Sequence, residues 1–460
     1  MPKDMRSWIT ELEEKGELLR VKKPVDPQTE MGALLYQSRD KGLLFENLKG
    51  FPGWKSLGMA PANVRHAAIA FGTTLEGLIP NVADRLDRRI PCKMVSDGPV
   101  KEVKKFGNDV DLTSLPVHRS GQKDAGPFIT GGLCVTKDPD TGKRNLSFHR
   151  LQLKGKNKTG ALIVPRHSFL NLRKYEERGI PMPIATFIGH HPLYYMAAAF
   201  TVAYGMDELE IAGEFLGEPV RLVKCETVDL EVPCDAEIVL EGHIPPHVRE
   251  DEGPFAEFQD YYVAGMGKNP IVEWQCMTMR RDAIFKSLQN GSEVEGCVYH
   301  KVPMSAAIFR RVRNIGGFVD LKNVLVQPGI FGVAVQMTPR YYGEAKNVLM
   351  GALSSEYFHP KIAIAVDEDV NIFSENDILW ALSTRVDPEK DITVIPGVRI
   401  HSMDAAAREM GVVGQLTWQR FGSKVLIDAT KPPTSDPAAR SQFERVKPIG
   451  FGQILLKDFL

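Results

Sequence analysis

The chain has 460 residues, enough for about two to four domains with a substantial buried core. Its 57 basic residues nearly balance its 58 acidic residues and form no long run, which gives no support for a nucleic-acid or membrane partner. Six cysteines without C-x-x-C spacing argue against a zinc site or a disulfide framework, and the lack of a long apolar run or signal peptide predicts a soluble cytoplasmic protein.

The first region, residues 1–109, has an α/β pattern. Asp4 is placed to cap a helix that ends at Gly16. Short apolar segments, among them Leu43–Phe45 and Ala67–Phe71, then alternate with turns rich in Gly, Pro and Asn.

The second region, residues 110–300, is rich in strands joined by long connections, which predicts a β-barrel or sandwich-like core. One helix interrupts it, with Ser168 as its N-cap and Gly179 as its end. The clearest predicted strands are 151–153, 161–164, 220–223, 236–244 and 271–279.

The third region, residues 301–431, alternates strands and helices as a layered α/β domain does. A helix is expected through 308–312, and Ser374 with Asp377 resembles a capping arrangement. Residues 432–460 read as a Pro-rich linker and an apolar tail that docks on a partner subunit. The other predicted elements are strands 324–326, 331–335, 362–366 and 392–395 and helices 344–353 and 374–384.

Two carboxylates, Glu252 and Glu257, stand five positions apart across a Gly-Pro break. Neither a regular strand nor a regular helix brings residues five apart to one face, so the pair converges only if the break bends the chain. Two crowded acids raise one pKa unless a cation holds them, which suits a site that carries a proton on one carboxyl. On spacing alone, a solvated acidic loop is the more common explanation.

Polar residues also recur in an otherwise apolar strand that contains Asn145 and Arg150. On a flat strand these two side chains face opposite sides, so a shared site needs a bulge or a large ligand, and an exposed strand face explains them equally well. His167 precedes the helix capped by Ser168, where free N–H groups favour an anion, although a lone histidine more often packs or caps. Glu208, alone, reads as a surface acid.

Together these stretches resemble the UbiD family of decarboxylases, which use prenylated FMN. The similarity is ordered along nearly the whole chain. It includes Asn145-Leu146-Ser147-Phe148-His149-Arg150, Lys154-Gly155-Lys156-Asn157-Lys158, Pro165-Arg166-His167, Asp207-Glu208, Gly217-Glu218-Pro219-Val220, Val223-Lys224-Cys225-Glu226, Asp229-Leu230-Glu231-Val232-Pro233, Glu237-Ile238-Val239-Leu240-Glu241-Gly242, Glu252 to Glu257, Tyr261-Tyr262, Val366-Asp367-Glu368-Asp369-Val370, Trp380-Ala381-Leu382-Ser383-Thr384-Arg385, Gly422-Ser423-Lys424 and Asp428-Ala429-Thr430.

The resemblance implies a role for each matching residue. Ligands for manganese or another divalent cation, which bridges the protein to the cofactor phosphate, are expected at Asn145, His167 and Glu208, with K+ as an additional candidate ion. A Glu-Arg-Glu network is expected at Arg150, Glu252 and Glu257; this chain has Glu at the second acidic position, where some members have Asp. Phe148, His149, Val164 and Arg166 fall in cofactor-lining stretches without repeating the commonest residues there.

The implied fold is a multidomain α+β or α/β protein with a flavin-reductase-like split β-barrel core between an N-terminal α/β region and a C-terminal α/β domain. The boundaries expected are 1–109, 110–300 for prenylated FMN and metal, 301–431 for oligomerisation, and 432–460 for linker and tail. The implied partners are a small carboxylic acid, a flavin prenyltransferase that supplies the cofactor, and identical subunits in a homodimer or homohexamer.

The predicted function is reversible, non-oxidative decarboxylation of an aromatic, heteroaromatic or α,β-unsaturated acid. Loss of CO2 from an sp2 carbon leaves an electron pair that no side chain can delocalise, so a cofactor must accept it. Glu257 is then the expected proton donor, with Glu252 and Arg150 setting its pKa and orientation. Two alternatives remain open: an FMN-dependent oxidoreductase on the same barrel, and a non-catalytic subunit of a carboxylase complex.

Overall fold

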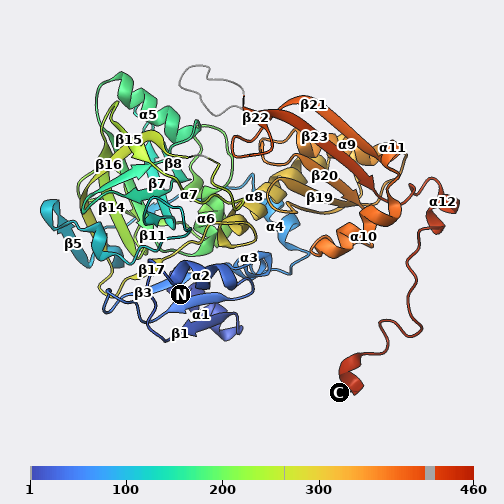
Figure 1. Ribbon diagram of the computed structural model, residues 1–460, viewed down its shortest axis with the longest axis horizontal. Coiled ribbons are helices and arrows are strands. Elements are labelled where there is room, and N and C mark those ends of the chain that lie inside the picture. Colours follow the sequence, from blue (N-terminus) through green and yellow to red (C-terminus); the bar gives the residue numbers. More distant parts are fainter. Residues whose placement is uncertain (1–2, 264, 410–419, 460) are drawn as a thin grey trace. The chain divides into compact units, whose positions relative to one another are not determined.

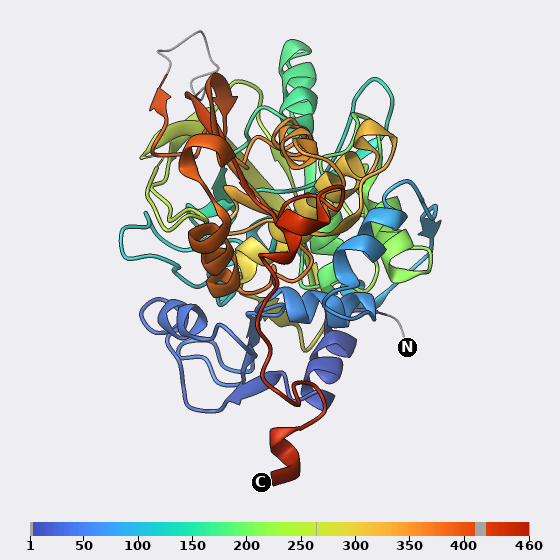
Figure 2. The same ribbon diagram turned by 90° about the vertical axis from the view of Figure 1, so that its right-hand side faces the viewer.

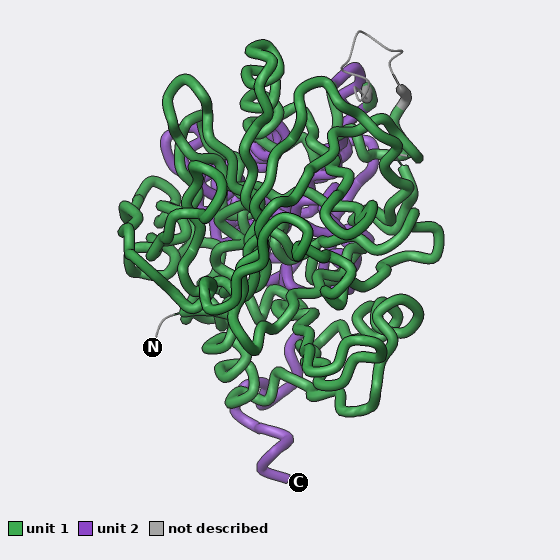
Figure 3. The backbone as a smooth tube through the Cα atoms, turned by 90° about the vertical axis from the view of Figure 1, so that its left-hand side faces the viewer, with its two compact units in different colours: residues 1–307, 356–359, 399–422 green, residues 308–355, 360–398, 423–460 purple. Residues whose placement is uncertain are grey.

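The computed structural model describes residues 3–263, 265–409 and 420–459 (Figure 1). The chain forms two compact units, coloured separately in Figure 3. Unit 1 comprises residues 1–307, 356–359 and 399–422, and unit 2 comprises residues 308–355, 360–398 and 423–460. Within the described residues, no helix is both long and apolar enough to cross a membrane.

Unit 1 begins with a small sheet and four helices. Asp4 caps the first helix in a reciprocal capping box with Ser7, so the predicted N-cap is confirmed. The sheet runs β1 (Leu18–Val21), β2 (Gly42–Phe45), β3 (Lys55–Gly58) and β17 (Ile284–Lys286), the last arriving from far along the sequence. The helices are α1 (Met5–Glu14), α2 (Met31–Gln37), α3 (Val64–Phe71) and α4 (Leu78–Arg85).

The largest sheet of unit 1 is a curled, antiparallel sheet of ten strands. Its longest strand, β16, pairs with four others, and Trp274 on it is buried and donates to Thr159 Oγ1 at 3.0 Å. The main path is β6 (Phe128–Ile129), β9 (Leu151–Leu153), β10 (Lys158–Ala161), β16 (Gly267–Met279), β14 (Ile238–Ile244), β11 (Met182–Ile188), β7 (Gly132–Lys137) and β8 (Arg144–Phe148), with β15 (Arg249–Glu252) and β5 (Val103–Phe106) added on β16.

Unit 1 contains three further helices, two of which begin at His167 and Glu208, residues expected to bind metal. They are α5 (His167–Glu177), α6 (Pro192–Ala198) and α7 (Glu208–Leu216). Asp207 caps α7 by accepting from the Leu209 N–H at 3.0 Å, and Gly217 ends the helix in the left-handed conformation. The remaining elements are β4 (Lys93–Met94), β12 (Arg221–Lys224) and β13 (Glu231–Pro233), which form a three-stranded sheet, and the 3-10 turns Pro99–Lys101, Gly107–Asp109 and Leu112–Ser114.

Unit 2 is built on a mixed sheet whose strands β19, β20 and β23 run parallel, and α9 (Glu344–Leu353) packs on β20. The strand order is β18 (Leu321–Leu325), β19 (Gly332–Met337), β20 (Ile362–Val366), β23 (Arg420–Ala429) and β21 (Ile392–Ile400), and β22 (Arg408–Glu409) pairs with β23. The other elements are α8 (Glu295–Val312), which runs from unit 1 into unit 2, α10 (Glu375–Arg385), α11 (Pro388–Asp391), α12 (Pro437–Ser441) and the 3-10 turns Ile315–Gly317 and Leu456–Phe459.

Several expected boundaries are corrected. Helix α5 begins at His167, so Ser168 lies inside the helix and is not its N-cap; its hydroxyl is used by neighbouring polar side chains instead. Helix α8 begins at Glu295, well before the predicted 308–312, and the segment Ala67–Phe71 lies in a helix. Strands 151–153 and 362–366 are confirmed, as is the Ser374 cap.

Candidate active site

Arg150 holds both acidic residues of the Glu-x-x-x-x-Glu segment. It lies between β8 and β9, Glu252 ends β15, and Glu257 lies in the loop that leads to β16. Arg150 Nε and Nη2 each donate to a different oxygen of Glu252 at 2.9 Å, and Nη1 donates to Glu257. Glu252 is fully buried and Glu257 is 6% exposed, so these are charge-assisted contacts in a poorly solvated place.

The bend between the two acids is made at Gly253. Its φ is 87°, in the region that disfavours a side chain, and an added Cβ would lie 2.8 Å from the Gly265 carbonyl oxygen. The Gly253 N–H donates to Gln152 Oε1 at 3.1 Å. The predicted break therefore turns the chain so that acids five positions apart meet one guanidinium.

Aromatic rings and an amide complete the surroundings of Arg150. The guanidinium carbon lies 5.1 Å from the ring centre of Phe255 and 6.0 Å from that of Phe128. Asn269 Nδ2 donates to Glu252 Oε2 at 2.9 Å. Glu252 thus accepts three hydrogen bonds, whereas among the described residues the Glu257 carboxylate accepts from one side chain, Arg150.

The environment of the site shifts the pKa values of Glu257 and Arg150. Burial raises the pKa of Glu257, and Glu252 and Asp124 add to that effect while Arg150 opposes it. Burial works against the charge of Arg150, but its two carboxylate partners outweigh it and raise the pKa of Arg150. The arrangement can therefore keep a permanent cation beside an acid that takes up and releases a proton.

The three residues expected to bind metal come together from three elements. Asn145 lies on β8, and His167 and Glu208 are the first residues of α5 and α7. Asn145 Nδ2 donates to Ser168 Oγ at 2.9 Å, next to His167, and the Leu146 N–H donates to Glu208 Oε2 at 2.8 Å. The bond to Ser168 directs the amide nitrogen of Asn145 away from any ion and leaves its oxygen to ligate.

The donor set fits a divalent cation. Glu208 is 2% exposed, and burial raises its pKa to about 8, which is the condition of a carboxylate that a cation would stabilise. Burial, followed by the charge of Arg166, lowers the pKa of His167, so its imidazole is neutral and able to ligate. Among the described residues, no group of three or more His, Cys, Asp or Glu is placed to hold a metal ion.

A chain of hydrogen bonds runs from Ser168, beside Asn145, to His149, the residue before Arg150. Ser147 Oγ lies 2.8 Å from Ser168 Oγ and 3.0 Å from His149 Nε2, and His149 Nδ1 lies 3.2 Å from the Leu162 carbonyl oxygen. Burial lowers the pKa of His149 to about 4, so this ring is neutral. His149 immediately precedes Arg150, so Asn145 of one centre and Arg150 of the other lie on one short segment that contains β8.

The other expected lining residues lie around these centres. Phe148 packs near the rings of Tyr195, Tyr299 and His300, with ring centres 5.8, 6.1 and 6.1 Å away. Val164 is exposed, and Arg166 donates to Thr201 Oγ1 at 2.9 Å. These flat rings and the exposed Val164 are compatible with a planar ligand, and their contacts with a cofactor stay predictions.

Some residues at the site were not expected from the sequence. Asp124, Gln152 and Asn269 form hydrogen bonds with Ala256, Gly253 and Glu252, and Ser168, expected only as a helix cap, bonds with Asn145. No local pattern marks Asp124 or Asn269, because the residues that they contact lie elsewhere along the chain. The common signal for Gln152 and Ser168, a polar residue beside a predicted site residue, is too general to select them.

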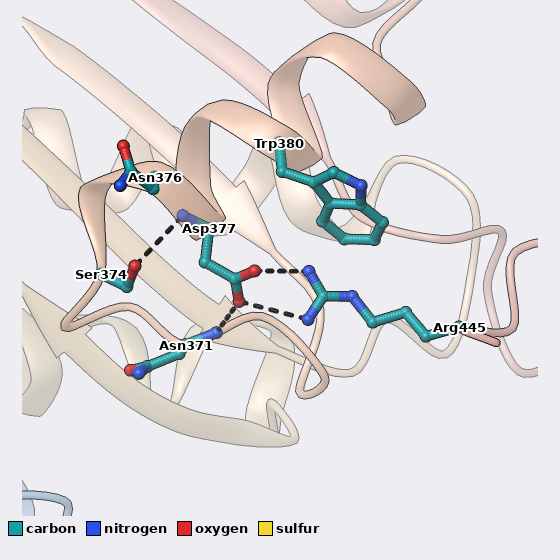
Figure 4. A pocket seen from close by; sticks show the side chains of 6 residues that line it. All are labelled: Asn371, Ser374, Asn376, Asp377, Trp380 and Arg445. Atoms are coloured by element: carbon teal, nitrogen blue, oxygen red, sulfur yellow. Dashed lines mark hydrogen bonds and ion pairs between the residues drawn. The ribbon is translucent and has the colours of Figure 1, made fainter. Parts of the chain in front are cut away.

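Two surface hollows lie elsewhere. One, of about 530 Å³ in unit 2, is lined by Trp380, Arg445 and Asp377, with Arg445 stacked on the indole ring and paired with Asp377 (Figure 4). The other, of about 440 Å³, includes Asp207 and Arg144 on the outer side of the Glu208 region. Neither contains Arg150, Glu252 or Glu257.

Known proteins resemble this chain along its whole length. Three domains described as parts of 3-octaprenyl-4-hydroxybenzoate carboxy-lyase match it: the N-terminal domain at residues 9–86, the Rift-related domain at 93–293 and the C-terminal domain at 297–429. The phenolic acid decarboxylase of Bacillus subtilis is 31% identical, covering 93% of this chain and 92% of its own.

Two solved structures are also similar. The UbiD-class enzyme HmfF from Pelotomaculum thermopropionicum, in complex with FMN, is 36% identical, covers 99% of this chain and 100% of its own, and superposes with a TM-score of 0.92. An evolved dimeric form of HmfF from the same organism, in complex with prFMN, is 35% identical, covers 100% of both chains and gives a TM-score of 0.88. The curled antiparallel sheet and mixed α+β architecture match these structures.

Proposed function

The chain belongs to the UbiD family of carboxy-lyases, and from that premise we propose that it decarboxylates an aromatic, heteroaromatic or α,β-unsaturated acid reversibly, using prenylated FMN and Glu257 as proton donor. The family membership and the decarboxylases among its relatives support the reaction class. The observation that supports the proton-donor role is that Arg150 donates hydrogen bonds to two buried carboxylates. Within the described part of the chain, Glu252 also accepts from Asn269, whereas Glu257 does not.

The proton steps follow from that geometry. When the carbon–carboxylate bond breaks, CO2 leaves and its electron pair remains with the substrate carbon. When bound, prenylated FMN supplies the electron sink for that pair. The proton of Glu257 then passes to the vacated carbon, and the resulting carboxylate is stabilised by Arg150 until it takes a proton from water. Glu252, held by three donors, keeps the guanidinium in place throughout.

The reverse direction uses the same groups. Carboxylation requires removal of the proton from the substrate carbon, and a Glu257 carboxylate beside Arg150 can accept it. Positioned proton transfer of this kind contributes roughly 10²- to 10⁴-fold in rate. The direction that dominates depends on the concentrations of CO2 and product.

Asn145, His167 and Glu208 would hold Mn2+, or another divalent cation, against the cofactor phosphate. The buried Glu208 carboxylate and the fixed amide of Asn145 support this assignment. K+ would be a further bound ion, and the barrel would be of the flavin-reductase-like split type. A flavin prenyltransferase would supply the cofactor, and the protein would act in the cytoplasm as a homodimer or homohexamer.

The test is to produce the chain together with a flavin prenyltransferase, record its absorption spectrum and measure CO2 release from a panel of unsaturated and aromatic acids. Glu257→Gln should bind the cofactor but lose most turnover. Glu250→Gln, a change in the same acidic segment at a residue paired with Lys158, should keep turnover and serves as the control. Asn145→Ala or His167→Ala should lose metal and cofactor together.

Other outcomes would point elsewhere. Wild-type turnover by Glu257→Gln would refute the proton-donor role. Binding of FMN alone, with reduction of an acceptor and no CO2 release, would favour an oxidoreductase. Loaded protein that turns over no acid until another subunit is added would favour a non-catalytic role.

A further inference from the structure

The loop that carries Glu257 is hydrogen-bonded to a second loop, residues 119–125, which lies outside the segments quoted in the sequence analysis. Asp124 lies in this second loop and is 2% exposed. Its Oδ1 accepts from the Ala256 N–H at 2.8 Å, and its Oδ2 accepts from the Gly121 N–H at 2.8 Å. One carboxylate therefore ties its own loop to the N–H of Ala256, the residue immediately before Glu257.

Further contacts make the two loops fit closely. The Ala125 N–H donates to the Pro254 carbonyl oxygen at 2.9 Å, and the Lys123 N–H donates to Tyr262 Oη at 2.9 Å. A Cβ placed on Gly121 would lie 2.9 Å from the Cβ of Ala256, so only glycine leaves room for the approach. The Glu257 loop is thus bonded to the second loop at Pro254 and at Tyr262, and Asp124 bonds to Ala256 between these two points.

Asp124 also acts on Glu257 through its charge. Burial is the first cause that raises the pKa of Glu257, and the negative charges of Glu252 and then Asp124 raise it further, against the effect of Arg150. Burial raises the pKa of Asp124, and the two peptide N–H bonds, Tyr262 and the charge of Arg119 oppose that effect. Tyr262 and Arg119 are the charged or titratable groups that face Asp124 itself. Asp124 therefore differs from Glu252, which contacts Arg150 directly.

We propose that Asp124 is a positioning residue for proton delivery: its carboxylate fixes the peptide that carries Glu257, and its negative charge favours the proton-bearing form of that acid. This inference rests on the proposed function of Glu257. It predicts that loss of the charge changes the pH range of activity, whereas loss of a merely structural contact lowers activity at every pH alike.

The test compares pH profiles of kcat/KM for the cofactor-loaded wild type and Asp124→Asn. Because Glu257 must carry a proton, activity falls as pH rises through its pKa. Removing a neighbouring negative charge lowers that pKa, so the alkaline limb of Asp124→Asn should move to lower pH. The maximum rate should fall by about tenfold from misplacement of Glu257, with cofactor absorption unchanged.

The matched control is Glu241→Gln. Glu241 is also buried and also accepts two peptide N–H bonds, from Glu226 at 2.9 Å and Thr227 at 2.7 Å, but it lies on β14 away from the Glu257 loop. Its alkaline limb should match that of the wild type. A shift of the same size in Glu241→Gln would overturn the inference, because it would reflect general loosening of the sheet.

Asp124→Glu provides a second measurement that does not depend on the stability of Asp124→Asn. It keeps the charge but not the geometry, so its rate should fall while its alkaline limb stays near that of the wild type. A wild-type rate in Asp124→Glu, or an unmoved limb in Asp124→Asn, would overturn the positioning role. Full turnover by Glu257→Gln, measured in parallel, would instead remove the proposed function on which it rests.

Discussion

At the scale of single residues, the site depends on the shape of the Arg150 side chain. Its planar fork meets Glu252 with two nitrogens and leaves a third for Glu257. A lysine ammonium has one nitrogen on a flexible stem and cannot reproduce this pattern. The identity of the cation, as well as its charge, is therefore expected to matter.

Arg150→Lys should test this directly. We expect turnover to fall by about 100-fold or more, because Glu257 is no longer aimed, and the unfolding free energy to fall by about 1–3 kcal/mol, because a buried acid loses a partner. Initial rates and thermal melts of the cofactor-loaded protein measure both. Arg249→Lys, which alters the half-exposed ion pair with Glu176, is the control and should leave turnover unchanged. Near-normal turnover in Arg150→Lys would show that the fork geometry is not required.

Single residues also show how far the sequence could lead. The pairing of Glu252 with Glu257 through a bend was inferred from spacing and a Gly-Pro break, and Arg150 was assigned to it by family resemblance. Asp124 could not be found in this way, since its contact with Ala256 spans 132 positions and no motif marks it. Contacts between distant loops depend on the folded path of both, which local patterns do not encode.

At the scale of secondary-structure elements, the important feature is the turn between β15 and β16. Glu252 ends β15, and Gly253 then takes a φ of 87° in a place without room for a Cβ. This turn brings Glu257 back to the guanidinium that Glu252 already contacts. The sequence predicts such a turn because glycine tolerates this backbone conformation and other residues do not.

Gly253→Ala should therefore damage the site through the backbone. We expect a lower melting temperature, equivalent to roughly 1–3 kcal/mol, and a large loss of turnover, because the clash with the Gly265 carbonyl displaces the Glu257 loop. Gly50→Ala is the matched control: Gly50 has a φ of 82° but nothing within 4 Å of an added Cβ. Equal losses of turnover in the two variants would contradict the role of the Gly253 turn.

Elements also show where local signals succeed and fail. Ser374 caps α10 as expected, because its hydroxyl accepts from the Asp377 N–H. Ser168 looked equally suitable, but its hydroxyl bonds with Asn145 and Ser147 from β8, and the helix begins one residue earlier at His167. Tertiary partners overrode the local preference at the position that matters for the candidate metal site.

At the scale of the whole molecule, strands far apart in sequence complete each other's sheets. Strand β17, at residues 284–286, pairs with β3 of the N-terminal sheet, which no periodicity analysis could indicate. The four expected regions, 1–109, 110–300, 301–431 and 432–460, stay predictions as independent domains. The two compact units show only that residues 1–307 contact one another more than they contact most of the C-terminal part.

The C-terminal segment offers a further test within unit 2. Figure 2 shows it leading from α12 to the last 3-10 turn as a long extended stretch. Before that stretch, Arg440 on α12 donates to both oxygens of the fully buried Asp367 at 3.0 and 2.7 Å, and to the Pro432 carbonyl at 2.9 Å. The predicted linker is thus tied back to the end of β20 by a buried ion pair.

Arg440→Ala should release this attachment. Among the described residues, Asp367 would keep one cationic partner, Lys431 at 3.6 Å, so we expect unit 2 to lose about 3 kcal/mol of stability. Limited proteolysis should cut between residues 432 and 445 faster than in the wild type, and amide exchange in β20 should quicken. Arg311→Ala, which removes bonds to Gly351 and Ser354 on the surface of the same unit, is the control. Unchanged cleavage in Arg440→Ala would mean that other contacts hold α12, whereas faster cleavage with normal turnover would separate the attachment of the tail from the chemistry of the Arg150 centre.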